Sequence, residues 1–281
     1  MIVARERPAR LVILGHPVSH SLSPVFQNAA LEHAGLPVRY DRLDVAPEAL
    51  HEALARLATE RAGGNVTIPH KEAVATAARC TSLAERVGAV NTFWHEQGRL
   101  IGHNTDVAGA TACIVALCPS GVADRRCAVL GAGGSAAAVL VALEDLGCRN
   151  VVVAARSPVR AARLVTRLAA RAGVSARVTG SVEDAVADAA LVINATPLGM
   201  RDDALPVSPA ALPHDAAIFD LVYRVGETAW VRACRAAGHA ASDGLPMLIE
   251  QGAAAFECWF GMAAPRDAMW RAIAAVAPTG S

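Results

Sequence analysis

The stretch Gly131-Ala-Gly-Gly-Ser-Ala136 decides the fold. It follows a short apolar run, Cys127 to Leu130, and opens into Ala137 to Leu146, a segment rich in Ala, Leu and Val at helical spacing. A strand, a glycine turn and a helix in this order are typical of the phosphate grip of a dinucleotide-binding fold. In such a fold the helix N-terminus faces the anion.

The small residues of this turn each suit that task. Gly131 would allow the tight turn, Gly133 would let the backbone approach a pyrophosphate, and Ala136 would let the helix lie close on the strand. A plain strand-to-helix turn that merely needs glycines is the alternative, and the second strand after the helix favours cofactor binding. The expected cofactor-binding residues here are Gly131, Gly133, Gly134, Ser135 and Ala136.

Length and charge narrow the class of protein. A chain of 281 residues is long enough for about two domains. The net charge of 0 and the pI near 7.1 give no electrostatic reason to expect nucleic acid or an anionic membrane as partner. No uninterrupted apolar run approaches the roughly 18 residues of a membrane span, and the charged N-terminus is unlike a secretory signal. We therefore expect a cytoplasmic protein that acts on small molecules.

Cysteine and histidine spacing argues against a disulfide framework and a metal site. The 7 cysteines include no C-x-x-C pair, and the 9 histidines show no paired ligand spacing. We expect the cysteines to be buried thiols in a reduced compartment and no metal to be bound.

The first part of the chain alternates strand-like and helix-like segments, which predicts a mostly parallel sheet between helices. A polar loop, Gly15 to Pro24, follows the first strand, where ligands bind in such sheets. Ser23 and Pro24 are expected to be the N-cap and first residue of a helix. The predicted strands are 11–14, 38–45, 64–68, 89–95 and 99–102, and the predicted helices are 23–34, 47–61, 70–78 and 82–87.

A second strand and helix series begins near Arg126, after a break at Pro119-Ser-Gly121. Its predicted strands are 127–130, 150–154, 191–194, 216–220 and 240–242, and its helices are 136–146, 159–172, 182–187 and 228–237, followed by 246–260 and 265–276. We place the crossover in the helix 107–117. The fold predicted is α/β with an N-terminal αβα domain, 1–106 completed by 245–281, and a Rossmann domain, 107–244.

The end of the second strand of the Rossmann series indicates which nucleotide binds. An NAD site usually has Asp or Glu there to accept from the ribose hydroxyls, whereas this chain has Ala155, Arg156 and Ser157, with Arg160 one helical turn on. Guanidinium groups suit a 2'-phosphate, so NADP(H) is preferred. The alternative is that the arginines form an ordinary solvated helix face.

Two further residues lie at strand ends. Lys71 follows the strand that ends near Thr67, and Asp106 stands where a strand leads into a helix. A lysine beside a carboxylate can pass a proton to a carbonyl oxygen as hydride arrives at carbon. Alone, Lys71 could equally be an exposed lysine and Asp106 a simple N-cap.

Together these residues resemble the shikimate dehydrogenase family. The resemblance covers nearly the whole chain and consists of seven motifs in order: Ser21-Leu-Ser-Pro24, Asn65-Val-Thr-Ile-Pro-x-Lys71, Gly88-Ala-Val-Asn-Thr92, Asn104-Thr-Asp106, Gly131-Ala-Gly-Gly134, Asn194-Ala-Thr196 and Asp243-Gly-Leu-Pro-Met-Leu-Ile-Glu-Gln251.

The resemblance implies reversible reduction of 3-dehydroshikimate to shikimate with NADPH, in a cleft between the two domains. It implies Lys71 and Asp106 as the catalytic pair. The implied substrate-binding residues are Ser21, Ser23, Thr67, Asn91, Tyr223 and Gln251. The implied cofactor-binding residues beyond the glycine turn are Arg156, Ser157, Arg160, Thr196, Gly244 and Met247.

The sequence departs from the family pattern at four positions. Gln27 stands where His is common, Ala155 where Asn is usual, Ala137 where a basic residue is usual, and Val225 where proline is usual. Quinate or an aminoshikimate is therefore an alternative substrate, and a non-catalytic NADP-binding sensor is an alternative of another class. A monomer or homodimer is expected.

Overall fold

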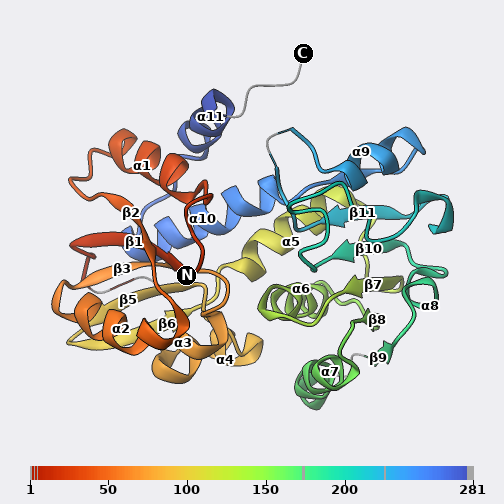
Figure 1. Cartoon of the computed structure of the whole chain (residues 1–281), viewed down its shortest axis with the longest axis horizontal. Coiled ribbons are helices and arrows are strands. Elements are labelled where there is room, and N and C mark those ends of the chain that lie inside the picture. Colours follow the sequence, from red (N-terminus) through yellow and green to blue (C-terminus); the bar gives the residue numbers. More distant parts are fainter. Residues whose placement is uncertain (1, 3, 5, 173–174, 225, 277–281) are drawn as a thin grey trace. The chain divides into compact units, whose positions relative to one another are not determined.

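The computed structural model describes residues 2, 4, 6–172, 175–224 and 226–276, with the side chains of 168–175 left out. Val225 and the end of the predicted C-terminal part, 277–281, lie outside the described residues. The chain forms two compact units (Figure 1). Unit 1 comprises the N-terminal part through Asp106 and the residues from Leu248 onward, and unit 2 comprises Val107–Met247.

Unit 1 is built on a six-stranded sheet of order β2-β1-β3-β5-β6-β4. Three of its strand pairs are parallel, and β5 pairs antiparallel with both β3 and β6. The mostly parallel sheet predicted here is confirmed. The strands are β1 Arg10–Gly15, β2 Tyr40–Asp44, β3 Ala62–Val66, β4 Arg79–Cys80, β5 Thr92–Glu96 and β6 Arg99–His103.

Helices cover both faces of this sheet (Figure 1). On one face, apolar side chains of α2, α3 and α4 bury Leu57, Val66 and Phe93 in a single cluster. On the other face α1 lies along α11, and α10 adds the buried rings of Phe256 and Trp259. The helices are α1 Ser23–His33, α2 Leu50–Thr59 with a 3-10 turn Pro47–Ala49 before it, α3 Lys71–Ala77, α4 Ser82–Val87, α10 Leu245–Phe260 and α11 Arg266–Val276.

Unit 2 is a doubly wound parallel sheet of order β12-β11-β10-β7-β8-β9. All five strand pairs are parallel, and the order runs outward in both directions from β7, so the switch point lies between β7 and β10. The Rossmann topology predicted for this part is confirmed. The strands are β7 Arg126–Leu130, β8 Asn150–Ala154, β9 Ser175–Thr179, β10 Leu191–Asn194, β11 Ala217–Asp220 and β12 Ala241–Ser242.

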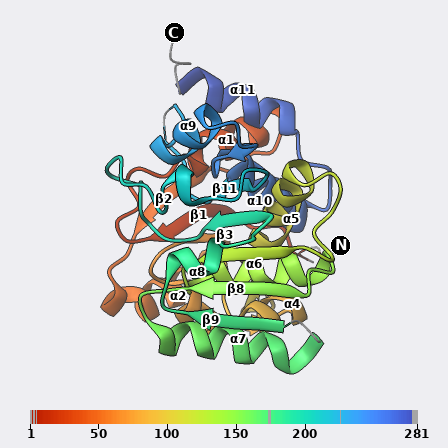
Figure 2. The same ribbon diagram turned by 90° about the vertical axis from the view of Figure 1, so that its right-hand side faces the viewer.

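The helices of unit 2 flank its sheet on both faces. One face packs α8 and α9 into a cluster around Val192, Ile218 and Trp230. On the other side α7 runs along β8 and β9, as Figure 2 shows. The helices are α5 Asp106–Leu117, which begins on the last residue of unit 1, α6 Gly134–Asp145, α7 Pro158–Ala172, α8 Val182–Val186 and α9 Ala229–Ala236, with a 3-10 turn Pro209–Ala211.

Two local predictions were wrong. Ser23 is the first residue of α1 rather than its N-cap. The N-cap is Leu22, whose side chain makes no capping bond, and the Oγ of Ser21 accepts the N–H of Ser23 at 3.2 Å. Two edge strands, β4 and β9, were also missed, since β4 has two residues and the apolar face of β9 consists of only Ala176 and Val178.

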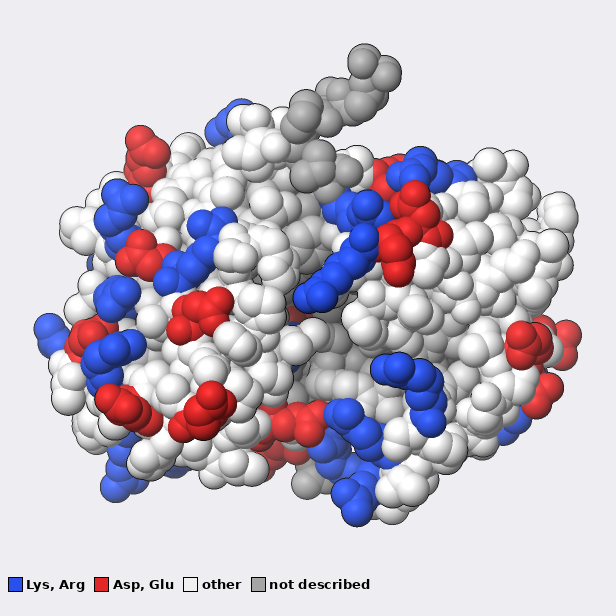
Figure 3. Space-filling view, in the orientation of Figure 1, with Lys and Arg blue, Asp and Glu red and all other residues white. Residues whose placement is uncertain are grey.

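Charges of both signs are interspersed over the face of unit 1 drawn in Figure 3, in keeping with the net charge of 0. Among the described residues no helix has the length and apolar character needed to cross a membrane. Within the same residues, no group of three His, Cys, Asp or Glu side chains has an arrangement suited to a metal ion.

Candidate active site

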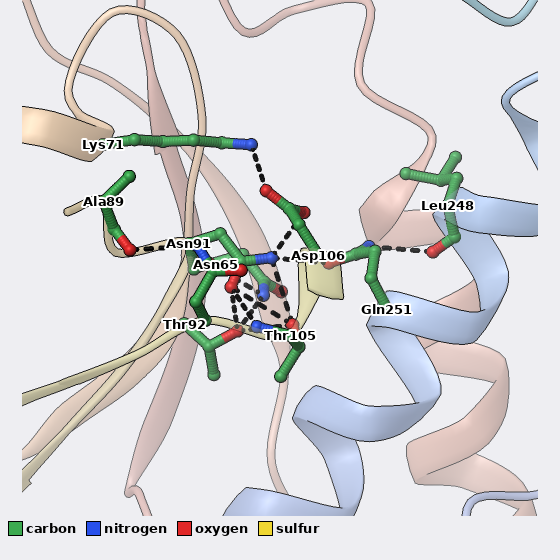
Figure 4. A network of polar contacts seen from close by, with 10 residues as sticks. Asn65, Lys71, Ala89, Asn91, Thr92, Thr105, Asp106, Leu248 and Gln251 are labelled. Atoms are coloured by element: carbon green, nitrogen blue, oxygen red, sulfur yellow. Dashed lines mark hydrogen bonds and ion pairs between the residues drawn. The ribbon is translucent and has the colours of Figure 1, made fainter. Parts of the chain in front are cut away.

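Lys71 and Asp106 meet in unit 1, although 35 residues separate them in the sequence (Figure 4). Lys71 is the first residue of α3 and Asp106 the first of α5. The Lys71 Nζ donates to Oδ2 of Asp106 at 2.6 Å, and the side chains are 14% and 7% exposed. An ion pair with so little exposure is screened only weakly by water.

Asn91 hydrogen-bonds to the other oxygen of this carboxylate. Its Nδ2 donates to Oδ1 of Asp106 at 2.7 Å and to Oε1 of Gln251 at 3.2 Å. Gln251 is held in turn by its own Nε2, which donates to the carbonyl of Leu248 at 2.8 Å. Four residues expected in the site therefore form one connected group.

Lys71 is also the only lysine in the sequence: all the rest of the 26 Lys and Arg residues are arginines. An arginine supplies charge but keeps its proton in proteins, whereas a lysine can release and recover one. All the remaining Lys and Arg positions of this chain are thus arginine, and the one lysine amine stands beside Asp106. This signal was present in the sequence and went unused in the prediction.

The polar loop between β1 and α1 carries the two candidate carboxylate-binding serines. Ser21 and Ser23 are 6% and 2% exposed. Arg42 of β2 donates through its Nη2 to the carbonyl oxygen of Ser21 at 2.6 Å, which fixes the loop from outside. Thr67 follows β3, where its N–H bonds to the carbonyl of Leu14 at 2.8 Å. Both serines and Thr67 belong to unit 1, with Lys71 and Asp106.

Unit 2 presents the glycine turn at the end of β7. Gly131 has a φ of +118°, and a Cβ there would lie 2.7 Å from the carbonyl oxygen of Ala195, so the fold itself requires glycine. Gly133 is different. It is the N-cap of α6 in an extended conformation, and a Cβ there would meet no atom within 4 Å.

The open space at Gly133 lies before the first turn of α6, whose leading N–H groups have no carbonyl partner within the helix. The first intrahelical bond runs from the N–H of Ala137 to the carbonyl of Gly133 at 3.0 Å. Ala136 is fully buried against the sheet side of the helix. This turn fits a phosphate group, because the space a side chain would fill is left free where backbone donors point.

The two arginines at the end of β8 are exposed, and Ser157 between them caps α7 by accepting the N–H of Arg160 at 3.4 Å. Figure 3 shows basic side chains gathered over the region of α7. Ala155 and Ala137 contribute no charge here, and Ala137 is buried in α6. Arg156 and Arg160 remain the residues that the sequence predicts for a 2'-phosphate, and Arg163 is also exposed on α7.

A buried polar network fixes the ends of β10 and β11. Asn194 accepts both the N–H and the hydroxyl of Thr196, at 3.0 and 2.6 Å, and donates to Asp220 at 2.8 Å. Thr228 donates to the second oxygen of Asp220 at 2.8 Å, and burial raises the pKa of this carboxyl. Thr196 is thereby held rigidly at the carboxyl edge of the sheet.

Three of the residues predicted to bind cofactor or substrate lie near the end of unit 2, and their surroundings within that unit can be described. A Cβ at Gly244 would overlap the carbonyl of Leu221, so a glycine is needed where the chain passes β11. Met247 is 7% exposed in the first turn of α10, and Tyr223 is partly buried. All three belong to unit 2, so Tyr223 is the one candidate substrate-binding residue that lies outside unit 1.

Gln27, one of the departures from the family pattern, is fully buried in α1. Its Nε2 donates to the carbonyl of Gly252 at 2.9 Å, next to Gln251, and its Oε1 has no hydrogen-bond partner among the described residues. The substitution thus keeps a link between α1 and α10.

Fold and site together define a two-unit α/β protein of the dehydrogenase class, with a dinucleotide-type unit and an acid–base pair on the other unit. Family models match in three places: the shikimate dehydrogenase substrate binding domain over residues 13–93, shikimate / quinate 5-dehydrogenase over 116–198, and the shikimate 5'-dehydrogenase C-terminal domain over 244–274.

The similarity extends along the whole chain. Shikimate dehydrogenase (NADP(+)) of Mesorhizobium japonicum is 41% identical over 95% of this chain and 96% of its own, and that of Symbiobacterium thermophilum is 44% identical over 93% and 92%. The crystal structure of shikimate 5-dehydrogenase from Thermus thermophilus in complex with NADP(H) and shikimate is 38% identical, with a TM-score of 0.83 over 94% of this chain and 97% of that one. This chain belongs to the shikimate dehydrogenase family, as the motifs predicted.

Proposed function

We propose that the protein is an NADP-dependent dehydrogenase that interconverts 3-dehydroshikimate and shikimate. Its relatives carry this activity in their names, and the Thermus thermophilus structure holds both NADP(H) and shikimate. The observation that carries the proposal is the pair of Lys71 and Asp106 at 2.6 Å, made by the only lysine of the chain.

Lys71 is the acid–base group in this proposal. In the reducing direction its ammonium donates a proton to the substrate carbonyl oxygen, and in the oxidising direction the amine takes the proton back from the hydroxyl. Asp106 holds the amine in place and stabilises its charged form, while Asn91 keeps the carboxylate fixed from the other side. When bound, NADPH supplies the hydride.

The substrate carboxylate is assigned to Ser21 and Ser23, at the start of α1. Hydroxyl groups and a helix N-terminus suit an anion there. Thr67, Asn91, Gln251 and Tyr223 are assigned to the ring hydroxyls and carboxylate. A site of amide and hydroxyl groups discriminates strongly against analogues that lack the matching groups.

We assign nucleotide binding to unit 2, and substrate binding to unit 1 with Tyr223 as a contribution from unit 2. The residues proposed to hold NADP(H) are Gly131, Gly133, Gly134, Ser135, Ala136, Arg156, Ser157, Arg160, Thr196, Gly244 and Met247. The open space at Gly133 supports the pyrophosphate position, and the exposed Arg156 and Arg160 support the 2'-phosphate.

The test is a turnover assay with the purified protein, in which NADPH absorbance is followed with shikimate, quinate and an aminoshikimate as separate substrates. We expect shikimate with NADP to give the highest kcat/KM. A higher kcat/KM for quinate or aminoshikimate would identify that compound, rather than shikimate, as the substrate. Tight NADP binding by calorimetry without turnover of any of the three would establish a sensor instead.

We further propose that the protein works in the cytoplasm as a monomer or homodimer. All seven cysteines are free thiols, six of them buried, which suits a reducing compartment. Light scattering on the purified protein measures the oligomeric state, and a larger assembly would contradict this part of the proposal.

A further inference from the structure

A chain of buried polar side chains lies behind the acid–base pair in unit 1. It starts at Tyr40 of β2, which is 1% exposed. The phenol donates to Oδ1 of Asn65 at 2.7 Å, and Nδ2 of Asn65 donates to the hydroxyl of Thr92 at 3.1 Å. None of these three residues is assigned a role in the proposed reaction.

The chain continues from Thr92 to the carboxylate (Figure 4). The Thr92 hydroxyl donates to Oδ1 of Asn91 at 3.0 Å, and Nδ2 of Asn91 donates to Oδ1 of Asp106 at 2.7 Å. Each of these four bonds has its donor on the side away from Asp106, and the Thr105 hydroxyl branches from the chain, 2.9 Å from that of Thr92 and 3.2 Å from Oδ1 of Asn91. Lys71 completes the arrangement by donating to Oδ2 of the same carboxylate.

The direction of these bonds is set by neighbouring groups that can only donate or only accept a hydrogen bond. A carboxylate and a backbone carbonyl only accept, and a backbone N–H only donates. Asn91 faces the carboxylate of Asp106 with its NH₂ and receives the N–H of Thr105 on its Oδ1 at 2.7 Å. Asn65 donates to the backbone carbonyl of Asn91 at 3.1 Å, so its Oδ1 faces Tyr40 and the phenol must donate.

The far end of the chain is equally well held. Asn28 clamps the backbone of Tyr40 by accepting its N–H at 3.0 Å and donating to its carbonyl at 2.9 Å. Burial raises the pKa of Tyr40 well above its usual value, so the phenol keeps the proton it donates.

We propose that Tyr40 and Thr92 are positioning residues for the reaction: their hydroxyl groups fix the orientation of Asn91, which holds Asp106 so that its second oxygen faces Lys71. The inference rests on the proposed function, because that function gives Lys71 its acid–base role. A fully satisfied buried network is rigid, and rigidity of supporting groups decides how well a reacting group is placed.

Thr92 offers a matched pair of variants. Thr92→Val keeps the shape and removes the hydroxyl, whereas Thr92→Ser keeps the hydroxyl and removes a buried methyl group. We expect kcat with shikimate to fall on the order of tenfold or more in Thr92→Val, with KM changed less than about threefold, since a small misplacement slows chemistry more than binding. Thr92→Ser should keep kcat within about twofold although it is the less well packed variant.

Tyr40→Phe tests the start of the chain by leaving Asn65 Oδ1 without its donor. Trp259→Phe is its control, since it also removes a buried donor, here the bond from Nε1 to the carbonyl of Phe93 at 3.2 Å, in the ring pair with Tyr40. We expect Trp259→Phe to lower the melting temperature at least as much as Tyr40→Phe, because it also leaves a cavity, and we expect a loss of kcat in Tyr40→Phe alone.

If the wild type turns over shikimate, the proposed function stands, and two outcomes would then overturn the inference alone. One is wild-type kcat in Thr92→Val, and the other is a loss in Thr92→Ser as large as that in Thr92→Val, which would mean a packing role. Absence of shikimate turnover in the wild type itself would overturn the proposed function and the inference together. If Tyr40→Phe does not fold, the Thr92 pair decides.

Discussion

Gly133→Ala separates the needs of the fold from the needs of the nucleotide. Gly133 has a φ of −95° and a ψ of −174°, a conformation open to any residue, and an added Cβ meets no atom within 4 Å. Alanine restricts the unfolded chain but is a poorer N-cap than glycine, so the two effects largely offset and the variant should lose no more than about 1 kcal/mol of stability.

The same methyl group would stand where the pyrophosphate is proposed to bind. An N–H···O bond spans about 2.9 Å, whereas a carbon and an oxygen approach to no less than about 3.3 Å. The phosphate would be pushed off the backbone donors of α6 and lose about two hydrogen bonds to a charged group, each worth about 1.5–3 kcal/mol. Taking the lower end, about 3 kcal/mol, the Kd for NADP should rise about 100-fold.

The assay is calorimetric titration of NADP into wild type and variant, with thermal unfolding measured on the same samples. Gly131→Ala is the control, because its φ of +118° and the carbonyl of Ala195 at 2.7 Å make a side chain costly for the fold. It should lower the Tm by several degrees through about 1–3 kcal/mol of strain. Unchanged NADP affinity in a stable Gly133→Ala protein would refute the assignment of this turn to the pyrophosphate.

Two further predictions concern charge. Arg156→Ala should lower kcat/KM for NADP about 10-fold or more and leave that for NAD within about twofold, since a guanidinium bonded to a phosphate is worth about 1.5–3 kcal/mol; equal losses with both nucleotides would contradict the 2'-phosphate role. Burial lowers the pKa of His103 from 6.5 to about 4, so the unfolded chain binds a proton that the folded chain excludes, and stability is lost as the pH falls from 6.5 through 4. This loss, about 3 kcal/mol, should be absent in His103→Asn, which keeps an acceptor for the Thr81 hydroxyl that lies 2.8 Å from His103 in the wild type. The measurement is denaturant unfolding of both proteins at pH 7 and pH 4. An equal loss of stability in the two proteins would contradict the prediction.

The sequence predicted the architecture well where local chemistry decides structure. Gly131 to Ala136 opens α6 as expected, and the alternation of apolar strands and helices gave both sheets. Local pattern failed at β9, an edge strand whose residues face neighbours on one side only, and at the start of α1, where Leu22 rather than Ser23 is the N-cap.

The candidate site shows a similar limit. Lys71 and Asp106 could be paired in advance only through the family resemblance, since nothing local in the sequence brings positions 35 residues apart together. Tyr40 carries no motif that marks it, and its place in the polar chain depends on the register that sets β2 beside β1 and β1 beside β3. The hydrogen bonds among Asn65, Thr92 and Asn91 follow from that sheet geometry.

The most direct test of the central claim is Lys71→Arg, assayed for shikimate oxidation with NADP. An arginine keeps the positive charge beside Asp106 but does not release its proton. General acid–base catalysis contributes about 10²–10⁴-fold, so kcat should fall by at least about 100-fold while KM for shikimate stays within a few-fold. A Lys71→Arg enzyme that keeps the wild-type kcat would show that Lys71 supplies charge alone and would contradict the acid–base role assigned to it.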